Sequence, residues 1–292
     1  MKIGILGSRN SWYVKTLTNA LEARRILSAS FPITGMVAGI DHRPGVRIGV
    51  EVLEKCDAII VRGIPSGSLE QIIFRMDVLH RLQSLGVKVI NSARTIERTV
   101  DKYFTSFLLE EADIPTPRTL VTERFEEAME AFRVLGGDVV VKPLFGSEGK
   151  GMVRVKGEDE AYRFFRALEL GRYVFYLQEF IPHSDWDIRV FVIGREAAAG
   201  MVRRGNDWKT NVAGGAEVEA LELSSELKEL SLRTASVVEA DYASVDIIKA
   251  EGGGYFVNEI NSIPGWKGLQ SVTGWDIADR IVDFVAELVR GK

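Results

Sequence analysis

Three residues near the C-terminal end of the chain carry side-chain oxygen atoms that could coordinate a hard metal ion, and the predicted fold brings these residues together. Residues 255–261 alternate as a β-strand does, and residues two apart in a strand share a face, so Glu259 and Asn261 point the same way. Asp246 is a lone acid in the apolar strand 243–248, and the glycine-rich stretch between the two strands predicts a hairpin. Carboxylate and amide oxygens are typical Mg²⁺ ligands, so we interpret the three residues as a metal site. For any one of them, a polar residue at a strand edge is the alternative.

A lysine among apolar residues precedes a glycine-rich loop in the middle of the chain. Lys142 ends the apolar run 139–142, and burial of a lysine is unfavourable unless it has a partner such as phosphate. The glycines of residues 145–151 allow backbone N–H groups to approach phosphates closely. The loop is not a Walker A motif, because Lys150 is followed by Gly151 rather than by Ser or Thr. We expect a phosphate site here, with a plain hairpin loop as the alternative.

The next predicted strand offers an edge that can bind a base. Residues 173–180 are typical of a strand and end in Gln178, Glu179 and Phe180, followed by Ile181. Adenine recognition needs an exposed edge with a backbone donor and acceptor between apolar walls. The end of this strand can supply such an edge and such walls.

Charged and apolar residues alternate in residues 187–193, so Asp187 and Arg189 share one face of a strand. We expect Arg189 either to form a structural ion pair with Asp187 or Asp185 or to bind a substrate carboxylate through two hydrogen bonds.

Basic residues also gather in the glycine-rich segment 201–215. Arg203, Arg204, Lys209 and Asn211 form an anion site if they converge, and a solvated basic loop is the alternative.

Strand and helix signals alternate over the first ninety residues, which predicts a parallel sheet of the doubly wound type. The expected strands are 2–6, 33–38, 57–61 and 87–90, and the expected helices are 11–27 and 68–85. Gly4 and Gly7 do not complete a G-x-G-x-x-G fingerprint, so we expect a Rossmann-like scaffold without a dinucleotide. Later helices are expected up to about residue 112 and over 224–240 and 275–289.

The composition excludes several classes of protein. Apolar residues make up 46% and charged residues 27% of the 292 residues, as in ordinary soluble domains. A net charge of −4 gives no basic footprint for nucleic acid. Cys56 is the only cysteine, which excludes an intrachain disulfide and suits a reducing compartment. The N-terminus lacks the pattern of a signal peptide, and no apolar run reaches the roughly 18 residues of a membrane span. We expect a cytoplasmic protein.

The order of these motifs resembles that of the ATP-grasp superfamily, and more narrowly that of the RimK-type amino-acid ligases. The resemblance covers about residues 92–292. It implies an α/β protein with the ATP-grasp fold: a Rossmann-like pre-ATP-grasp domain at residues 1–92, a central lobe at 93–177 and a C-terminal lobe at 178–292. The nucleotide would then lie between the two lobes.

The resemblance also implies roles for individual residues. The expected ATP contacts are Lys102, Lys142, Gly146, Ser147, Gly149, Gly151, Gln178, Glu179, Phe180, Ile181, Asp187, Lys209 and Asn211. Asp246, Glu259 and Asn261 match ligands of Mg²⁺ or Mn²⁺, with two ions expected. Arg203 is the expected stabiliser of the acylphosphate or tetrahedral intermediate, and the expected holders of substrate carboxylates are Arg189, Arg204 and Asn211. Lys209 departs from the arginine that RimK-type ligases commonly carry, which keeps the charge but loses the bidentate fork.

The implied chemistry is ATP-dependent amide formation through an acylphosphate. Residues 62–71, 97–102 and 262–270 resemble the branch of the family that adds L-glutamate to a pterin, tetrahydromethanopterin, to form tetrahydrosarcinapterin. The alternatives are ligases that act on the glutamate tail of the deazaflavin coenzyme, on a protein C-terminus or on a lysine-biosynthesis carrier protein. A non-catalytic ATP-binding protein on the same fold is a further hypothesis. We expect small-molecule substrates and a homo-oligomer, either a dimer or a tetramer.

Overall fold

A parallel sheet forms the N-terminal part of the molecule. The computed structural model describes residues 1–146, 149–205, 208, 210 and 216–291. The strands run in the order β2-β1-β6-β7, and all pairs are parallel. They are β1 (Lys2–Leu6), β2 (Leu27–Phe31), β6 (Ala58–Val61) and β7 (Lys88–Ile90), with helices α1 (Trp12–Ala23) and α2 (Leu69–Ser84). The predicted doubly wound arrangement is therefore present.

One strand of this sheet was placed wrongly by the sequence analysis. The helix predicted to reach Leu27 ends at Ala23, and Leu27–Phe31 is the second strand, β2. Arg25 adopts a left-handed φ of 55°, and the N–H of Ile26 donates to the Leu21 carbonyl at 3.0 Å, which closes the helix. The sequence carries no glycine there to signal this end. The expected strand 33–38 is instead a 3₁₀ turn (Ile33–Gly35) and β3 (Met36–Ala38), which pairs with β4 (Val46–Ile48) in a separate small sheet completed by β5 (Glu51–Val52).

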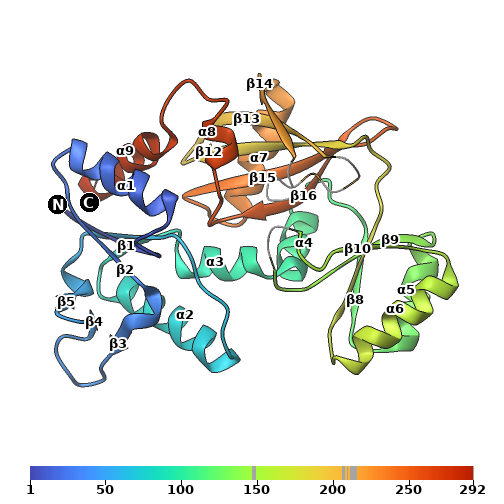
Figure 1. Ribbon diagram of the computed structural model, residues 1–292, viewed down its shortest axis with the longest axis horizontal. Helices are drawn as coiled ribbons and strands as arrows, with labels where there is room; N and C mark the ends of the chain where they lie inside the picture. The colour runs from blue at the N-terminus through green and yellow to red at the C-terminus, as the bar shows by residue number, and fades with distance from the viewer. Residues whose placement is uncertain (147–148, 206–207, 209, 211–215, 292) are drawn as a thin grey trace.

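A second sheet is antiparallel and is covered by two helices on one face (Figure 1). Its order is β10-β9-β11-β8. The strands are β8 (Thr119–Thr122), β9 (Asp138–Lys142), β10 (Val153–Lys156) and β11 (Phe175–Glu179), and the helices are α5 (Phe125–Val134) and α6 (Glu158–Leu170). We call it the central sheet.

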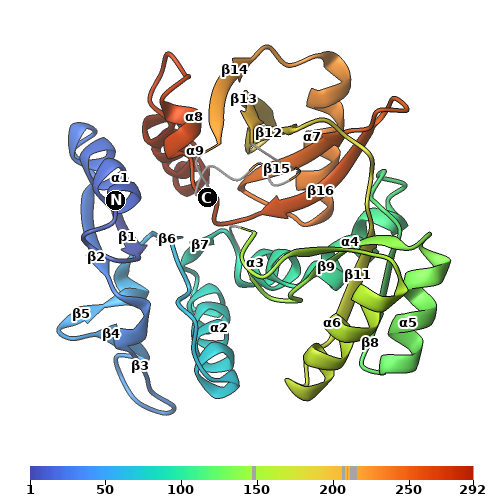
Figure 2. The ribbon, with the colours of Figure 1, turned by 45° about the vertical axis from the view of Figure 1, so that its right-hand side comes forward.

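A third sheet, also antiparallel, has the order β14-β13-β12-β15-β16. Its strands are β12 (Trp186–Ile193), β13 (Glu196–Arg204), β14 (Glu217–Leu221), β15 (Tyr242–Lys249) and β16 (Tyr255–Asn261). The helices around it are α3 (Ala93–Val100), α4 (Lys102–Glu111), α7 (Ser225–Val237), α8 (Lys267–Gln270) and α9 (Ile277–Arg290). Figure 2 shows this C-terminal sheet above the helix α3, with the central sheet below it at the lower right.

The three larger sheets lie within residues 2–90, 119–179 and 186–261, and the small sheet β3-β4-β5 falls in the first of these ranges. The predicted boundary between 177 and 178 falls inside β11, which runs on to Glu179. As folding units, the ranges 1–92, 93–177 and 178–292 stay a prediction. Within the described residues, no helix is both long enough and apolar enough to cross a membrane.

The carboxyl ends of β1 and β6 face the C-terminal part of the chain. Doubly wound sheets bind ligands at this switch point of the strand order. Here Arg62, which follows β6, donates to the Pro264 carbonyl at 2.8 Å and to the Tyr242 hydroxyl at 3.0 Å. Its guanidinium also lies 4.4 Å from the ring centroid of Trp266, whose side chain is buried. The N-terminal sheet therefore uses this edge to hold the loop that follows β16.

Asn91 links the end of the N-terminal sheet to the start of β15 and to the residue that follows β16. Its fully buried amide donates to the carbonyls of Tyr242 (2.7 Å) and Ser262 (2.6 Å) and accepts from the N–H of Asp241 at 2.6 Å. Three backbone groups thus depend on one buried side chain.

Replacement of Asn91 by Ala is expected to lower the free energy of unfolding by about 2–4 kcal/mol, because it leaves buried polar groups without partners. Urea unfolding measures this loss, and Asn10→Ala in an exposed loop is the control. A loss below about 1 kcal/mol would show that water or a rearranged backbone replaces these bonds.

Candidate active site

The site is a pocket of about 400 Å³ between the central sheet and the C-terminal sheet. Its walls come from β9 and β11 on one side and from β12, β13, β15 and β16 on the other. A third contribution comes from Tyr13 of α1 and residues 263–268 after β16. Its size is typical of a small-molecule site.

The predicted metal residues line this pocket together. β15 and β16 pair as a hairpin, and Asp246 lies directly opposite Glu259, while Asn261 lies opposite Ser244. The spacing of two between Glu259 and Asn261 keeps both on the pocket face, as expected from the strand period.

The hairpin carries an irregularity that the sequence did not reveal. The register shifts between Asp246 and Ile247, so β16 has one extra residue at this point. Asn258, which a regular strand would turn away from Glu259, also lines the pocket, and its Oδ1 accepts a hydrogen bond from Lys142 Nζ at 2.8 Å. No residue pattern in the strand signals this bulge, which is why Asn258 was missed.

Two arginines and two carboxylates form a buried ion-pair network on the C-terminal sheet. Arg189 makes two hydrogen bonds of 2.7 Å to Asp246. Arg203 binds Asp187 in the same bidentate manner, with Nε at 2.7 Å from Oδ1, and its Nη2 also lies 3.1 Å from Asp246. Arg203, Asp187 and Asp246 are each at most 5% exposed.

The partner of Arg189 differs from the expected ones. Its ion pair is with Asp246 on the neighbouring strand, not with Asp187 or Asp185. The reason is geometric: Arg189 and Asp246 are direct cross-strand partners, as are Asp187 and Arg203. Such partners lie about 5 Å apart, whereas residues two apart along one strand are separated by about 7 Å.

The two acids of the hairpin carry opposite pKa shifts. Burial alone would raise the pKa of Asp246, but Arg189 and Arg203 outweigh it and hold this pKa at about 2. Burial raises the pKa of Glu259, the nearby Asp246 adds to the rise, and Lys102 and Lys142 oppose it. Glu259 is therefore a carboxylate that gains from a further cation.

The donor set fits a divalent cation. A carboxylate has about four acceptor positions, and the arginines use three of those on Asp246, which leaves one on Oδ1. Among the described residues Glu259 accepts no hydrogen bond, and Asn261 adds an amide oxygen. No cluster of three or more His, Cys, Asp or Glu side chains suited to a metal occurs in the described ranges, so any cation here would use two carboxylates and an amide.

Two lysines approach the hairpin from the other side. Lys142, at the end of β9, is 6% exposed, and burial lowers its pKa to about 8. Lys102 is the first residue of α4, and its Nζ donates to the Gly146 carbonyl at 3.0 Å. Burial also lowers the pKa of Lys102, while Glu259 opposes that shift. Both lysines are thus placed where an anion would stabilise their charged forms.

The predicted base-binding edge, residues 178–181, lies along the pocket. The Gln178 side chain donates to the Thr119 hydroxyl at 3.1 Å, and Glu179 accepts from Arg118 through two bonds of 2.8 and 2.6 Å. Arg154 lies 3.2 Å from the ring centroid of Phe180. In the described part of the chain the Ile181 N–H donates to no carbonyl, so this edge keeps a free backbone donor.

Other predicted residues are placed differently. Gly149 lines the pocket, whereas Gly146 meets Lys102, and Gly151 adopts a φ of 77° beside Pro143. Ser147, Lys209 and Asn211 lie outside the described residues.

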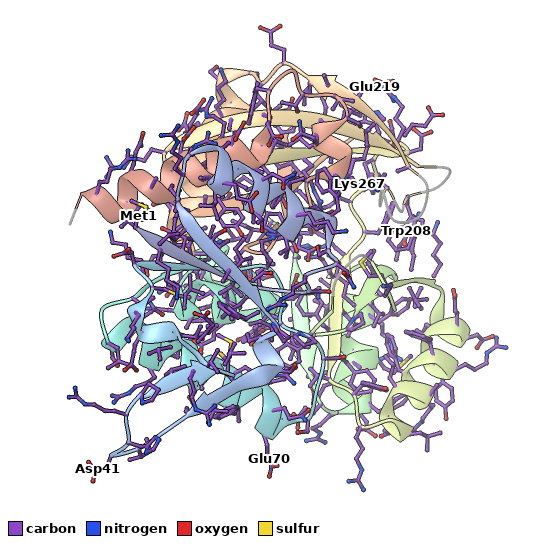
Figure 3. The ribbon with its side chains drawn as sticks, turned by 60° about the vertical axis from the view of Figure 1, so that its left-hand side comes forward. Met1, Asp41, Glu70, Trp208, Glu219 and Lys267 are labelled. Atoms are coloured by element: carbon purple, nitrogen blue, oxygen red, sulfur yellow. The ribbon has the colours of Figure 1, made fainter. Side chains whose placement is uncertain are left out.

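The structure does not bring Arg204 to the pocket. It is exposed and pairs with Glu219 at 3.3 Å. Glu219 lies at the top of the molecule in Figure 3, away from Lys267 and Trp208, which both line the pocket. The alternation along β13 explains this, because adjacent residues face opposite sides of a sheet.

Residues 99–285 match the family model of the RimK-like ATP-grasp domain. The chain belongs to the RimK-like ATP-grasp family. Among its curated relatives, the tetrahydromethanopterin:α-L-glutamate ligase of Methanocaldococcus jannaschii is 33% identical over 99% of this chain and 100% of that protein. The α-aminoadipate–LysW ligase LysX of Saccharolobus solfataricus is 32% identical over 72% of this chain and 78% of the relative.

Solved structures of ATP-grasp proteins share the fold of this family member. The ligase PsnB in complex with a minimal precursor, Mg and ADP has a TM-score of 0.76 and 22% identity over 99% of this chain and 98% of its own. A RimK domain protein from Sphaerobacter thermophilus has a TM-score of 0.78 and 22% identity over 97% and 99% of the two chains. The predicted ATP-grasp fold and the predicted class, an ADP-forming ligase, are confirmed.

Proposed function

We propose that this ligase joins L-glutamate to a carboxylate of a tetrahydromethanopterin-type acceptor, with conversion of ATP to ADP and phosphate. The observation that carries the proposal is the pocket, whose lining contains Lys142 of the central sheet and Glu259 of the C-terminal sheet, while Lys102 of α4 lies close enough to favour the charge of Glu259. The acceptor is supported by three relatives of that name, which match 83–99% of this chain at 31–33% identity.

In this proposal the nucleotide spans the pocket from residues 178–181 to the metal hairpin. The free N–H of Ile181 suits the adenine. The buried Lys142 and the half-buried Lys102 suit the phosphates, since neither has a carboxylate partner among the described residues. Gly149 belongs to the same site, and Gly146, Ser147, Gly151, Lys209 and Asn211 stay predictions.

Asp246, Glu259 and Asn261 would hold Mg²⁺, and we propose two ions, for which Mn²⁺ can substitute. When bound, the metal would neutralise charge on the phosphates and polarise the phosphoryl oxygens.

The reaction itself needs positioning and charge stabilisation from this chain. A carboxylate oxygen of the acceptor attacks the γ-phosphorus, the bond to ADP breaks, and an acylphosphate forms. The amine of L-glutamate then attacks the acyl carbon, phosphate leaves, and the amine loses a proton as the amide forms. Arg189 and Arg203 use Nε and Nη2 for carboxylates, and within the described residues their Nη1 groups form no hydrogen bond. In this proposal the Nη1 groups stabilise charge that develops on the substrates.

The two steps are tested by ADP release and by isotope transfer. ADP release should require MgATP, L-glutamate and the acceptor together. An acceptor carboxylate labelled with ¹⁸O should deliver one labelled oxygen to the released phosphate. ADP release without either carboxylate substrate, or phosphate without label, would contradict the acylphosphate route.

Nucleotide affinity is expected to depend on the protonation of Lys142. With a pKa of about 8, its charge is lost as the pH rises above 8, and the affinity for ADP should fall because a neutral amine does not attract phosphate. Unfolded lysine keeps its proton up to 10.5, so between these values the unfolded chain binds more protons and this group's contribution to stability rises with pH.

Titration calorimetry with ADP at several pH values between about 7 and 9.5 measures the effect. Lys142→Arg is the control, because arginine stays charged over this range. Parallel pH curves for the two proteins would contradict the assignment.

A protein carrier is the second candidate acceptor, because LysX-type relatives match 72% of this chain at 32% identity. We further propose that the enzyme acts as a homo-oligomer, a dimer or a tetramer, on small molecules in the cytoplasm. The net charge of −4 supports the absence of a nucleic-acid partner.

A further inference from the structure

One group of residues in the pocket lining, which we call the outer end, takes no part in the proposed nucleotide site. This outer end is formed by Tyr13 of α1 and by the residues that follow β16, namely Ile263, Pro264, Gly265, Lys267 and Gly268. It joins parts of the chain that are about 250 positions apart in the sequence. Lys267 lies on the same side of the molecule as Trp208, another residue of the pocket wall (Figure 3).

The backbone of the outer end is firmly held. Trp266 is 1% exposed and packs edge-on against Tyr13, with ring centroids 4.9 Å apart. Arg62 lies beside both rings and binds the Pro264 carbonyl at 2.8 Å. Lys267 therefore extends from a fixed backbone position, while its own side chain is exposed.

Lys267 differs from the other cations of the pocket. Arg189 and Arg203 are paired with carboxylates, and Lys142 donates to Asn258. Within the described ranges Lys267 forms no ion pair and no side-chain hydrogen bond. A pocket that binds acidic substrates thus has one cation ready for a further anion.

Tyr13 adds a donor to the same end. Its hydroxyl sits close over Gly265, where an added Cβ would lie only 2.7 Å from the oxygen. In the described part of the chain this hydroxyl has no hydrogen-bond partner. A hydroxyl donor and an ammonium group at one end of a pocket suit a carboxylate, whose two oxygens can accept from both.

We propose that Lys267 and Tyr13 bind a carboxylate of a substrate other than the one that is activated. This rests on the proposed function, in which both L-glutamate and the acceptor carry carboxylates. The strand β16 supplies Glu259 and Asn261 and leads directly to Lys267, so the subsite follows the reacting centre along the chain and shares no residue with 178–181. Lys267 and Tyr13 are then specificity-determining residues, which position a substrate by its second acid group.

The test compares Lys267→Met and Tyr13→Phe with the wild type for the KM of L-glutamate, acceptor and ATP. Loss of a charge-assisted hydrogen bond should raise the KM of one carboxylate substrate about 10- to 100-fold in Lys267→Met. The substrate whose KM rises identifies the source of the carboxylate. Tyr13→Phe should raise the same KM by a smaller factor, and Lys267→Arg should restore most of the affinity. The KM of ATP should not change.

Matched controls are Lys228→Met and Tyr173→Phe, both exposed and outside the pocket lining. Unchanged KM values for both carboxylate substrates in Lys267→Met would overturn the subsite. So would an equal rise for ATP, which would indicate a disturbed pocket.

Binding measured without turnover separates the two proposals. L-glutamate and tetrahydromethanopterin are titrated in turn into the wild type and Lys267→Met with ADP and Mg²⁺ present. Tighter binding of one of these substrates by the wild type than by Lys267→Met supports the subsite. Equal affinities of the two proteins for both substrates overturn it. Absence of ADP release by the wild type with both substrates contradicts the proposed function instead.

Discussion

Replacement of Arg203 by Met is expected to lower the free energy of unfolding by about 3–5 kcal/mol. Arg203 is the shared partner of Asp187 and Asp246, and all three side chains are buried. Without it, Asp187 keeps a buried charge with no arginine beside it, whereas Asp246 keeps Arg189. The loss of unfolding free energy therefore comes mainly from the buried Asp187 carboxylate, which no longer has an arginine partner.

The neighbouring residue provides the control for this prediction. Arg204 pairs with Glu219 on the exposed side of the same strand, and Arg204→Met should cost no more than about 1 kcal/mol. The double variant Asp187→Leu with Arg203→Met should recover much of the loss, because it removes both buried charges. Urea unfolding of the four proteins decides the matter. Equal losses of unfolding free energy in Arg203→Met and Arg204→Met would show that the buried network contributes no more to stability than a surface ion pair.

Glu259→Gln is expected to lower kcat/KM at least about 100-fold while the protein stays folded, because loss of a metal ligand removes several kcal/mol of transition-state stabilisation. The amide keeps the shape of the side chain, and Glu259 accepts no hydrogen bond from the described residues. Burial and Asp246 both disfavour its charge, so its removal should not weaken the fold.

ADP release at several Mg²⁺ concentrations measures the loss, and thermal unfolding checks the fold. Glu251→Gln in the exposed loop of the same hairpin is the control. If Glu259→Gln kept wild-type activity at all metal concentrations, Glu259 would not be a metal ligand.

The sequence was sufficient for the parts of the site that depend on local periodicity. Asp246, Glu259 and Asn261 followed from the period of a strand and a short glycine-rich connection, and Lys142 followed from its apolar neighbours. These features require no knowledge of distant contacts.

The sequence was insufficient to predict contacts of the site that depend on how distant parts of the chain pack together. The partner of Arg189 depends on the strand beside it, and the bulge that turns Asn258 into the pocket depends on the register of a pair. Tyr13 and Lys267 line the same pocket because Arg62 and Trp266 dock the N-terminal sheet onto the loop after β16. The strand β2 was missed because a left-handed Arg25, rather than a glycine, ends the helix before it.

The central claim is that this pocket makes an amide from L-glutamate and a pterin carboxylate. Its most direct test is mass spectrometry of the products after incubation with MgATP, L-glutamate and a panel of acceptors. The panel holds tetrahydromethanopterin, the deazaflavin coenzyme and a peptide that ends in glutamate. We predict one added glutamyl residue on the pterin, with ADP released in equal amount, and no product from the other two. Unchanged masses of all three acceptors would contradict the account, and a product from the coenzyme or the peptide alone would contradict the pterin.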